Sequence, residues 1–201
     1  HHPRIAKTTD EIKEKRQDYI SNIKSIFKNR MPEEKEKNFI DFSLFMLTYQ
    51  NACDDRGFLE TIGKLVHPWL EINTSNSGST EEYKTQKSPA NKTKRKVGIY
   101  FDNPNKEHVI CQHYFQLVKS LDKESFDVTI IKGPTAAGKN NKELEKLAFR
   151  VIQLPNNLRS SVEMIRELNL DVLVYTEMHS SPNPYCLAHN RMAKTQVVLP
   201  G

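Results

Sequence analysis

Apolar residues recur at intervals of three and four along the first part of the chain, a spacing typical of helices that bury one face. The pattern predicts a first helix over 10–29, with Asp10 able to cap its start. A second helix is expected over 38–52, where apolar residues lie nearly all round, which indicates a buried helix. A third helix is expected over 56–71, and Pro68 marks either its end or a kink.

The pattern changes in the second half of the chain, where short runs rich in β-branched and aromatic residues alternate with amphipathic stretches. We expect strands over 96–101, 126–131, 150–154, 171–177 and 195–200, and helices over 108–122, 141–149, 157–169 and 184–192. This alternation is typical of a parallel sheet with helices on both faces. The expected fold class is therefore α/β, a Rossmann-like parallel sheet preceded by a small α-helical region. Ligands of such sheets bind outside the carboxyl ends of the strands, so we expect chemistry in the loops there.

Between the two patterns lies a stretch with almost no apolar residues, 73–95, in which Ser, Thr, Asn and Lys dominate. This composition is typical of a flexible linker, and it separates a helical region over 1–72 from a Rossmann-like domain over 96–201. Basic residues gather toward its end: Lys84, Lys87, Lys92, Lys94, Arg95 and Lys96. A solvated linker explains them better than a nucleic-acid patch, because no aromatic residue after Tyr83 is interleaved with the charges.

Composition and length limit the class of protein. The chain has 201 residues, a formal net charge of +5 and 37% hydrophobic residues, which suits one large domain or one domain with a smaller attachment. No run approaches the roughly 18 apolar residues of a membrane helix, and the start of the chain lacks the apolar centre of a signal peptide. The three scattered cysteines, Cys53, Cys111 and Cys186, do not suggest a disulfide framework. We therefore expect a cytoplasmic protein with no membrane partner.

The segment Gly133–Lys139 reads G-x-x-x-x-G-K between an apolar run and a helical pattern, which is the outline of a phosphate-binding P-loop. A P-loop enzyme also needs a Ser or Thr after the Lys to hold Mg²⁺, and here Asn140 and Asn141 follow. The segment also follows the second expected strand, whereas the motif usually follows the first. A surface turn explains the segment better, and a P-loop enzyme stays as an alternative.

Two loops carry side chains suited to a polar site. His108 is expected where a helix begins, and the positive pole of that helix favours a neutral ring able to accept a proton. Glu177, His179 and Ser180 follow the fourth expected strand directly, and such side chains beside a strand end are suited to lining a pocket. The alternatives are a histidine that merely starts a helix and an ordinary loop.

Four side chains could together supply zinc ligands: Cys111 with His113, and Cys186 with His189. The two pairs are distant in sequence, and both fall within expected helices, where cysteine is commonly a buried apolar residue. We therefore expect no metal site.

A family resemblance begins in the first expected strand and extends to the next one, over "KVGIYFDNPNKEHVICQHYFQLVKSLDKESFDVTII". This stretch resembles the opening of the catalytic region in SPINDLY-like glycosyltransferases, the bacterial relatives of O-linked N-acetylglucosamine transferase. A second motif of that family is similar to "LDVLVYTEMHSSPNPYCLAHNRMAKTQVVLPG". The positions that match it are Asp171, Leu173, Tyr175, Glu177, Pro182, Leu187, Ala188, Arg191, Ala193, Gln196 and Gly201. The likeness covers residues 36–201, and Met192 and Lys194 depart from it.

The resemblance implies a GT-B enzyme, in which two Rossmann-like domains face each other across the active site. This chain matches the N-terminal domain, while the family continues after the position of Gly201 into a second domain that holds the nucleotide of the sugar donor. We therefore expect these residues alone to be inactive. No metal and no bound cofactor are implied, because such enzymes stabilise the leaving diphosphate with helix dipoles and basic side chains. The co-substrate is a nucleotide sugar such as a UDP-sugar.

The resemblance also implies roles for individual side chains. It makes His108 the candidate catalytic base or donor-contacting residue. The residues implied to line the cleft are Glu177, His179, Ser180, Arg191 and Gln196. The leading prediction is thus a fragment of a glycosyltransferase that moves an N-acetylglucosamine-like sugar to a protein hydroxyl or another hydroxyl acceptor, with no nucleic-acid partner. A non-catalytic protein-interaction module and the P-loop enzyme are the alternatives.

Overall fold

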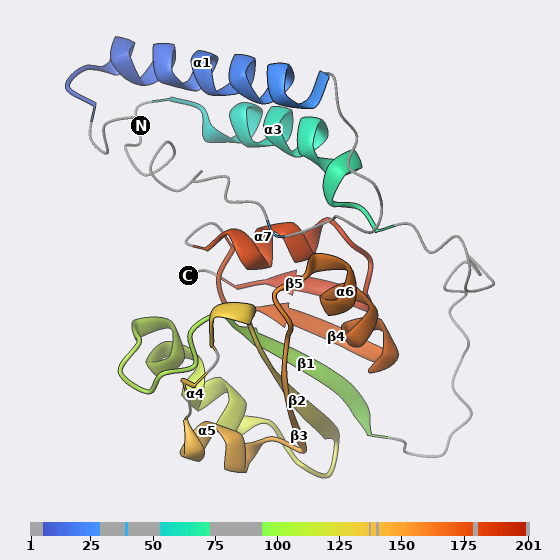
Figure 1. Cartoon of the computed structure of the whole chain (residues 1–201). Coiled ribbons are helices and arrows are strands. Elements are labelled where there is room, and N and C mark those ends of the chain that lie inside the picture. The colour runs from blue at the N-terminus through green and yellow to red at the C-terminus, as the bar shows by residue number, and fades with distance from the viewer. Residues whose placement is uncertain are drawn as a thin grey trace.

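Helices precede a region in which strands and helices alternate (Figure 1). The computed structural model describes residues 6–28, 39, 53–72, 94–136, 138–139, 141–178 and 181–199. The helices are α1 (Thr9–Lys28), α3 (Asp55–Leu70), α4 (Val109–Ser120), α5 (Lys142–Leu147), α6 (Leu158–Glu167) and α7 (Pro182–Ala188), with a short 3-10 helix η2 (Pro134–Ala136). The strands are β1 (Arg95–Phe101), β2 (Phe126–Lys132), β3 (Arg150–Gln153), β4 (Leu170–Tyr175) and β5 (Ala193–Val198).

Two predicted segments fall largely on residues that the structure does not describe. Apart from Phe39, the helix expected over 38–52 lies outside the described residues, and so do residues 73–93 of the expected linker. Both predictions therefore stay untested. Among the helices that are described, none is both long enough and apolar enough to cross a membrane.

All five strands run parallel in one sheet, in the order β3-β2-β1-β4-β5. The central strand β1 pairs with β2 on one side, where Val97 lies opposite Val128, and with β4 on the other, where Val97 lies opposite Val172. The chain therefore moves outward from β1 to β3 and then crosses back to build β4 and β5. The predicted fold class, a Rossmann-like parallel sheet preceded by a helical region, is confirmed.

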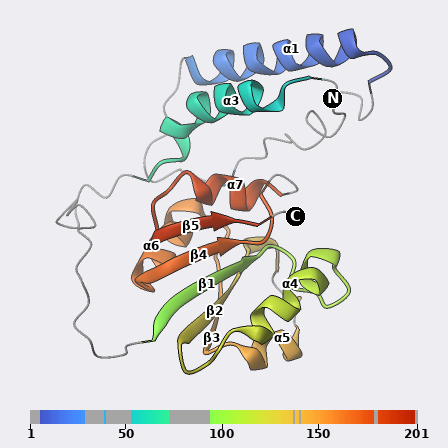
Figure 2. The same cartoon turned by 180° about the vertical axis from the view of Figure 1, so that it is seen from behind.

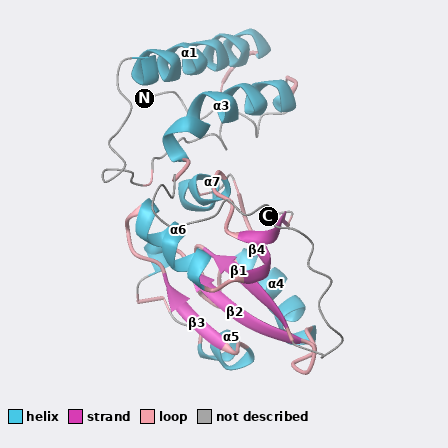
Figure 3. Cartoon of the chain, turned by 90° about the vertical axis from the view of Figure 1, so that its right-hand side faces the viewer, coloured by secondary structure: helices cyan, strands magenta, loops and turns pink. Residues whose placement is uncertain are grey.

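Side chains of β1 alternate between two hydrophobic cores, one on each face of the sheet. Ile99 belongs to the core covered by α4 and α5, together with Cys111 and Leu144 (Figure 2). Tyr100 belongs to the opposite core, together with Leu158 of α6 (Figure 3). Both faces of β1 are thus buried, which explains why its sequence is an unbroken apolar run instead of an alternating one.

Helix α3 contributes to the second core from a distant part of the sequence. Its buried residues recur every four positions, at Phe58, Ile62, Val66 and Leu70. All four belong to the same hydrophobic cluster as Leu173 of β4. Because burial of each such side chain contributes about 1.5–3 kcal/mol, this stripe is a main attachment of the helical region to the sheet.

The ends of α1 and α3 differ from the predicted ones. Asp10 does not cap α1, because the helix starts one residue earlier and the Thr8 hydroxyl accepts a hydrogen bond from the Glu11 N–H at 3.2 Å. Pro68 does not end α3, which continues to Leu70. A proline this close to the carboxyl end of a helix removes only one of its last hydrogen bonds, so the final turn survives.

Helix α7 is shorter and begins earlier than the helix expected over 184–192. Ser181 caps it by accepting a hydrogen bond from the Asn183 N–H, and Pro182 occupies the first turn, where its missing N–H costs nothing. The helix ends at Ala188, before the turn that leads into β5. The sequence predicted a short helix here but not its cap.

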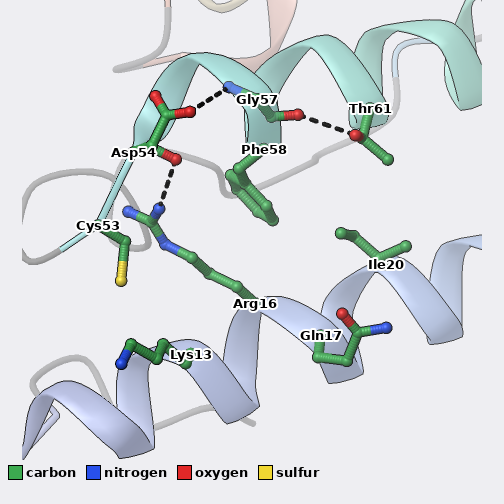
Figure 4. Close-up of a pocket in the computed structure, with 9 residues that line it drawn as sticks. All are labelled: Lys13, Arg16, Gln17, Ile20, Cys53, Asp54, Gly57, Phe58 and Thr61. Atoms are coloured by element: carbon green, nitrogen blue, oxygen red, sulfur yellow. Dashed lines mark hydrogen bonds between the residues drawn. The ribbon is translucent and has the colours of Figure 1, made fainter.

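Arg16 joins α1 to the start of α3. Its guanidinium donates to the Asp54 carbonyl at 3.2 Å and to the Asp55 carboxylate, and it lies 5.1 Å from the centre of the Phe58 ring. Figure 4 shows Arg16 reaching across a groove of about 310 Å³ between the two helices. A buried arginine with these partners fixes how the two helices pack.

The segment after α3 is held against the sheet domain by two polar side chains. The side chain of Asn190 accepts from the Ile72 N–H at 2.8 Å and donates to the Leu70 carbonyl at 3.0 Å. The Arg166 guanidinium of α6 donates to the Ile72 carbonyl at 3.4 Å. These bonds satisfy backbone groups that would otherwise be buried unpaired at the end of α3.

Two histidines meet where α3 packs on α7. The Nδ1 atoms of His67 and His189 lie 3.2 Å apart, so one ring donates its proton to the other. The Glu71 carboxylate lies 3.7 Å from His67 Nε2, and the Tyr185 ring packs edge-on against His189. Burial, and secondarily the neighbouring His67, lowers the pKa of His189 to about 4.

Acid is expected to weaken this contact through His189. Its native pKa of about 4 lies below the unperturbed value of 6.5, so the contribution to stability is complete above pH 6.5 and is lost as the pH falls toward 4. Between pH 7 and pH 5 the free energy of unfolding should fall by about 2 kcal/mol through this group. Urea unfolding at both pH values measures it. His189→Asn should lack this decrease, whereas His113→Asn, at an exposed position of α4, should keep it; equal pH dependence in all three proteins would contradict the assignment.

Candidate functional site

The strand order reverses between β1 and β4, and we use the word crevice for the edge where the carboxyl ends of these two strands meet. These neighbouring parallel strands end together, with Tyr100 opposite Tyr175. After β1 the chain turns to the face covered by α4, and after β4 it turns to the face covered by α7 (Figures 1 and 2). In open α/β sheets ligands bind at such a reversal of direction. The loops after β1 and β4, which carry the predicted residues His108 and Glu177, therefore lie at one edge of the sheet.

Asp102, the first residue after β1, accepts four hydrogen bonds at this edge. Its Oδ1 accepts from the Tyr100 hydroxyl at 2.6 Å and from the Asn183 side-chain amide at 2.9 Å. Its Oδ2 accepts from the Ser181 hydroxyl at 2.7 Å and from the Thr135 hydroxyl at 3.1 Å. One buried carboxylate thus connects the ends of β1, the turn after β2 and the start of α7. We refer to Asp102 with these four donors as the Asp102 cluster.

Gly133 is required by the Asp102 cluster. A Cβ atom at this position would overlap both the Asp102 carboxylate and the Tyr100 hydroxyl. The Gly133 N–H donates to the Phe101 carbonyl at 2.9 Å, which keeps the backbone close to the end of β1. The first glycine of the P-loop-like motif is therefore explained by packing against a neighbouring strand.

A second carboxylate, Glu177, is buried beside this cluster. The pKa of Tyr100 is raised well above its usual value, first by burial, next by the charge of Asp102, and to a smaller extent by the charge of Glu177. Before Glu177, the Thr176 hydroxyl donates to the Tyr100 carbonyl at 2.8 Å, which fixes the end of β4 against β1. The crevice is thus built on a rigid polar base that carries negative charge.

His108 occupies the cap position of α4, where the sequence predicted it, but its side chain makes no capping hydrogen bond. The residue is half-buried, and its Nδ1 is buried with no hydrogen-bond partner among the residues that the structure describes. A buried nitrogen of this kind is commonly satisfied by water or a ligand. Chemically, His108 can exchange a proton with a group bound at this edge of the sheet.

Of the other predicted site residues, only Arg191 and Gln196 belong to the described part of the chain. His179 and Ser180 lie outside the described residues. Arg191 precedes β5, which starts beside the start of β4 at the opposite edge of the sheet, whereas Gln196 lies within β5, opposite Leu173 of β4. There Arg191 donates to the Lys194 carbonyl at 2.8 Å, and the Gln196 side chain accepts from the Met192 N–H at 2.7 Å. Both side chains thus make hydrogen bonds within the α7–β5 connection, and their place in the cleft stays a prediction.

The segment Gly133–Lys139 does not form a phosphate cradle. The Lys139 N–H donates to the Ala136 carbonyl at 2.9 Å and closes a turn after η2. Helix α5 begins only after Asn141, whose side chain accepts from the Leu144 N–H at 3.1 Å and so occupies the end of the helix that would face phosphate. The geometry favours the surface turn over the P-loop enzyme.

The proposed zinc ligands are separated by the sheet. Cys111 is buried in the core under α4 and α5, whereas Cys186 is buried in the opposite core. They cannot share one metal ion. In the part of the chain that is described, no group of three or more His, Cys, Asp or Glu side chains is placed to hold a metal.

Sequence reasoning missed Asp102, although a signal was present. Asp102 is a carboxylate that directly follows an unbroken apolar strand, at the edge where a site was expected. Its partners Thr135 and Ser181 lie 33 and 79 residues further along the chain, and no local pattern pairs them with it. Only the arrangement of the strands in the sheet brings Thr135 and Ser181 to Asp102.

Comparison with known proteins supports the fold but does not assign the chain to a family. No family model matches the sequence, and no match is found among curated proteins. Among solved structures, the chain is similar to an O-GlcNAc transferase mutant from Thermobaculum terrenum, with a TM-score of 0.59 and 13% sequence identity. The match covers 94% of this chain and 34% of that one, so this chain spans about a third of the transferase. The structural similarity therefore extends over both the helices and the Rossmann-like sheet, the arrangement that the sequence resemblance implied.

Gly133→Ala is expected to destabilise the protein by about 1–3 kcal/mol, because the added methyl group displaces Asp102 and Tyr100. Gly63→Ala in α3 is the matched control, since nothing lies within 4 Å of the added atom. It should stabilise the protein by about 0.4–1 kcal/mol through lower entropy of the unfolded chain. Chemical denaturation of both variants measures the difference, and equal effects of the same sign would contradict the packing argument.

Millimolar Mg-ATP is expected to leave the melting temperature of the protein unchanged, because Asn141 occupies the end of α5 that a P-loop uses for phosphate. Thermal unfolding with and without the nucleotide measures this. An increase that Lys139→Ala abolishes would restore the P-loop interpretation.

Proposed function

We propose that these residues are the N-terminal, acceptor-side half of a nucleotide-sugar-dependent glycosyltransferase of the O-GlcNAc transferase and SPINDLY-like type. One observation carries the proposal: the fold similarity to an O-GlcNAc transferase extends over 94% of this chain. A Rossmann-like sheet alone hosts many activities. The similarity here includes the helical region packed on the sheet, which is a more specific arrangement than the sheet itself.

In the proposed reaction, His108 is the general base of an inverting sugar transfer. Its neutral ring accepts the proton of the acceptor hydroxyl as that oxygen bonds to the anomeric carbon of the sugar. The bond between the anomeric carbon and the diphosphate breaks, and the nucleoside diphosphate leaves with the electron pair. This assignment is supported by the buried Nδ1 of His108, which has no hydrogen-bond partner among the described residues and lies at the end of the loop after β1.

The remaining parts of the reaction come from outside the described crevice. A second Rossmann-like domain holds the nucleotide, and helix dipoles with basic side chains stabilise the leaving diphosphate without a metal ion. Glu177, His179 and Ser180 line the acceptor side in this proposal, and Arg191 and Gln196 shape the part of the domain next to β5. The acceptor is the hydroxyl of another protein, the sugar is N-acetylglucosamine-like, and the enzyme is cytoplasmic.

The full-length protein that contains these residues is expected to transfer N-acetylglucosamine from UDP-N-acetylglucosamine to protein, and the 201-residue chain alone is expected to be inactive. His108→Ala should lower kcat by about 10²–10⁴-fold, which is the usual contribution of a general base. His113→Ala is the matched control, because His113 is exposed on the same helix. Incorporation of radiolabelled sugar measures all four proteins.

Two results would contradict this proposal. One is sugar transfer by the 201-residue chain itself, and the other is equal activity of the His108→Ala and His113→Ala proteins. Absence of transfer from UDP-, GDP- and other nucleotide sugars, combined with tight binding of a protein partner, would instead favour the interaction module.

A further inference from the structure

We infer that Asp102 is the positioning residue of this crevice: its carboxylate holds the start of α7 against the end of β1, from which the loop that carries His108 leaves. The inference rests on the proposed function, because it assigns a role within that reaction. One side chain at the end of β1 accepts hydrogen bonds from the turn after β2 and from the start of α7.

Both ends of the β4–α7 turn are attached to β1. At the beginning of the turn, the Thr176 hydroxyl and N–H both point at the Tyr100 carbonyl, at 2.8 and 3.4 Å. At its end, Ser181 and Asn183 donate to Asp102. The end of β4 and the start of α7 are therefore both bonded to the end of β1, and the loop that follows β1 carries His108.

The Ser181 hydroxyl has two functions in this connection. Its oxygen caps α7 by accepting from the Asn183 N–H at 3.4 Å, while its proton is donated to Asp102 at 2.7 Å. Asp102 consequently fixes the rotamer of the cap, and through it the direction in which α7 leaves the crevice. All residues of this link from β1 to the first turn of α7 belong to the described part of the chain.

The chemistry of the cluster requires a carboxylate. An ionised aspartate only accepts hydrogen bonds and has about four lone-pair sites, which the four donors fill. An asparagine at position 102 keeps the shape, but its NH₂ group faces the Thr135 and Ser181 hydroxyls, which must then reverse to accept. Ser181 can no longer donate in that arrangement, and the charge that strengthened all four bonds is lost.

Asp102 is a positioning residue and not a catalytic one. It is only 8% exposed, and its described partners leave no lone pair for a substrate. Gly133 provides the space in which the Tyr100–Asp102 pair lies, so the turn after β2 is also shaped around this carboxylate. Its influence on the reaction must therefore pass through the loops that it holds.

Asp102→Asn in the full-length protein tests the inference. We expect kcat for sugar transfer to fall about 10- to 100-fold, because small displacements of reacting groups have effects of this size. KM for the nucleotide sugar should stay within about twofold, since the donor is held by the other domain. The assay temperature is chosen so that both proteins are fully folded by near-UV circular dichroism, which removes any loss due to global unfolding.

Asp122→Asn is the matched control. Asp122 also accepts hydrogen bonds, from the Glu124 N–H at 3.0 Å and from the Ser125 hydroxyl at 2.6 Å, but it lies in an exposed turn before β2, at the opposite edge of the sheet. Its replacement should leave both kcat and KM unchanged. Unchanged kcat in folded Asp102→Asn, or equal effects of the two substitutions, would overturn the inference.

Hydrogen exchange separates this inference from the proposed function. In the 201-residue chain, Asp102→Asn should speed amide exchange over 176–183 about tenfold or more, with β2 and β3 unaffected. If the unmodified full-length protein transfers no sugar, the proposed function fails whatever the exchange shows. If it does transfer sugar and exchange over 176–183 is unchanged by Asp102→Asn, the positioning role fails and the proposed function stands.

Discussion

The hydrophobic core on the sheet face that carries Tyr100 and Leu173 extends into helix α3, which precedes the sheet in sequence by more than twenty residues. A parallel sheet is stable only when both faces are covered. On one face α4 and α5 cover the core (Figure 2). On the other face α6, α7 and α3 share one continuous core, so the helical region is an integral part of the hydrophobic core and not an appendage to it (Figure 3).

That shared core also determines what the crevice can do. The sheet places the ends of β1 and β4 together, and the packing of α7 between the sheet and α3 prevents the start of α7 from drifting. A proton-accepting histidine is effective only when its distance from the reacting hydroxyl is maintained. The hydrophobic contacts far from the crevice and the polar contacts within it therefore serve the same geometric requirement.

Most of the architecture could be predicted from the sequence, because strands and helices are encoded by local periodicity. The unbroken apolar run of β1 and the four-residue spacing in α3 are examples. Contacts across long sequence separations could not be predicted in this way. Asn183 is 81 residues from Asp102, and nothing near either residue indicates the hydrogen bond between them.

The candidate site was only partly predictable for the same reason. The alternation of strands and helices correctly indicated that the loops after β1 and β4 meet at one edge. The family motif contains both Glu177 and Arg191. In the structure Glu177 follows the end of β4, whereas Arg191 precedes β5, which starts at the opposite edge of the sheet. A sequence motif groups residues by their order along the chain, whereas a site requires residues that are close in space. The sheet topology decides which residues of a motif lie close together.

The two glycines that imitate a nucleotide-binding signature illustrate how such a coincidence arises. Gly133 is small because side chains at the end of a neighbouring strand fill the space where its Cβ would be, and the φ of 77° at Gly138 lies in the left-handed region that favours glycine. Two unrelated steric demands, five residues apart, thus reproduce a consensus that normally reports ATP or GTP. A motif scan would therefore score this turn as a nucleotide site in any homologue that keeps both steric demands, whether or not that homologue binds a nucleotide.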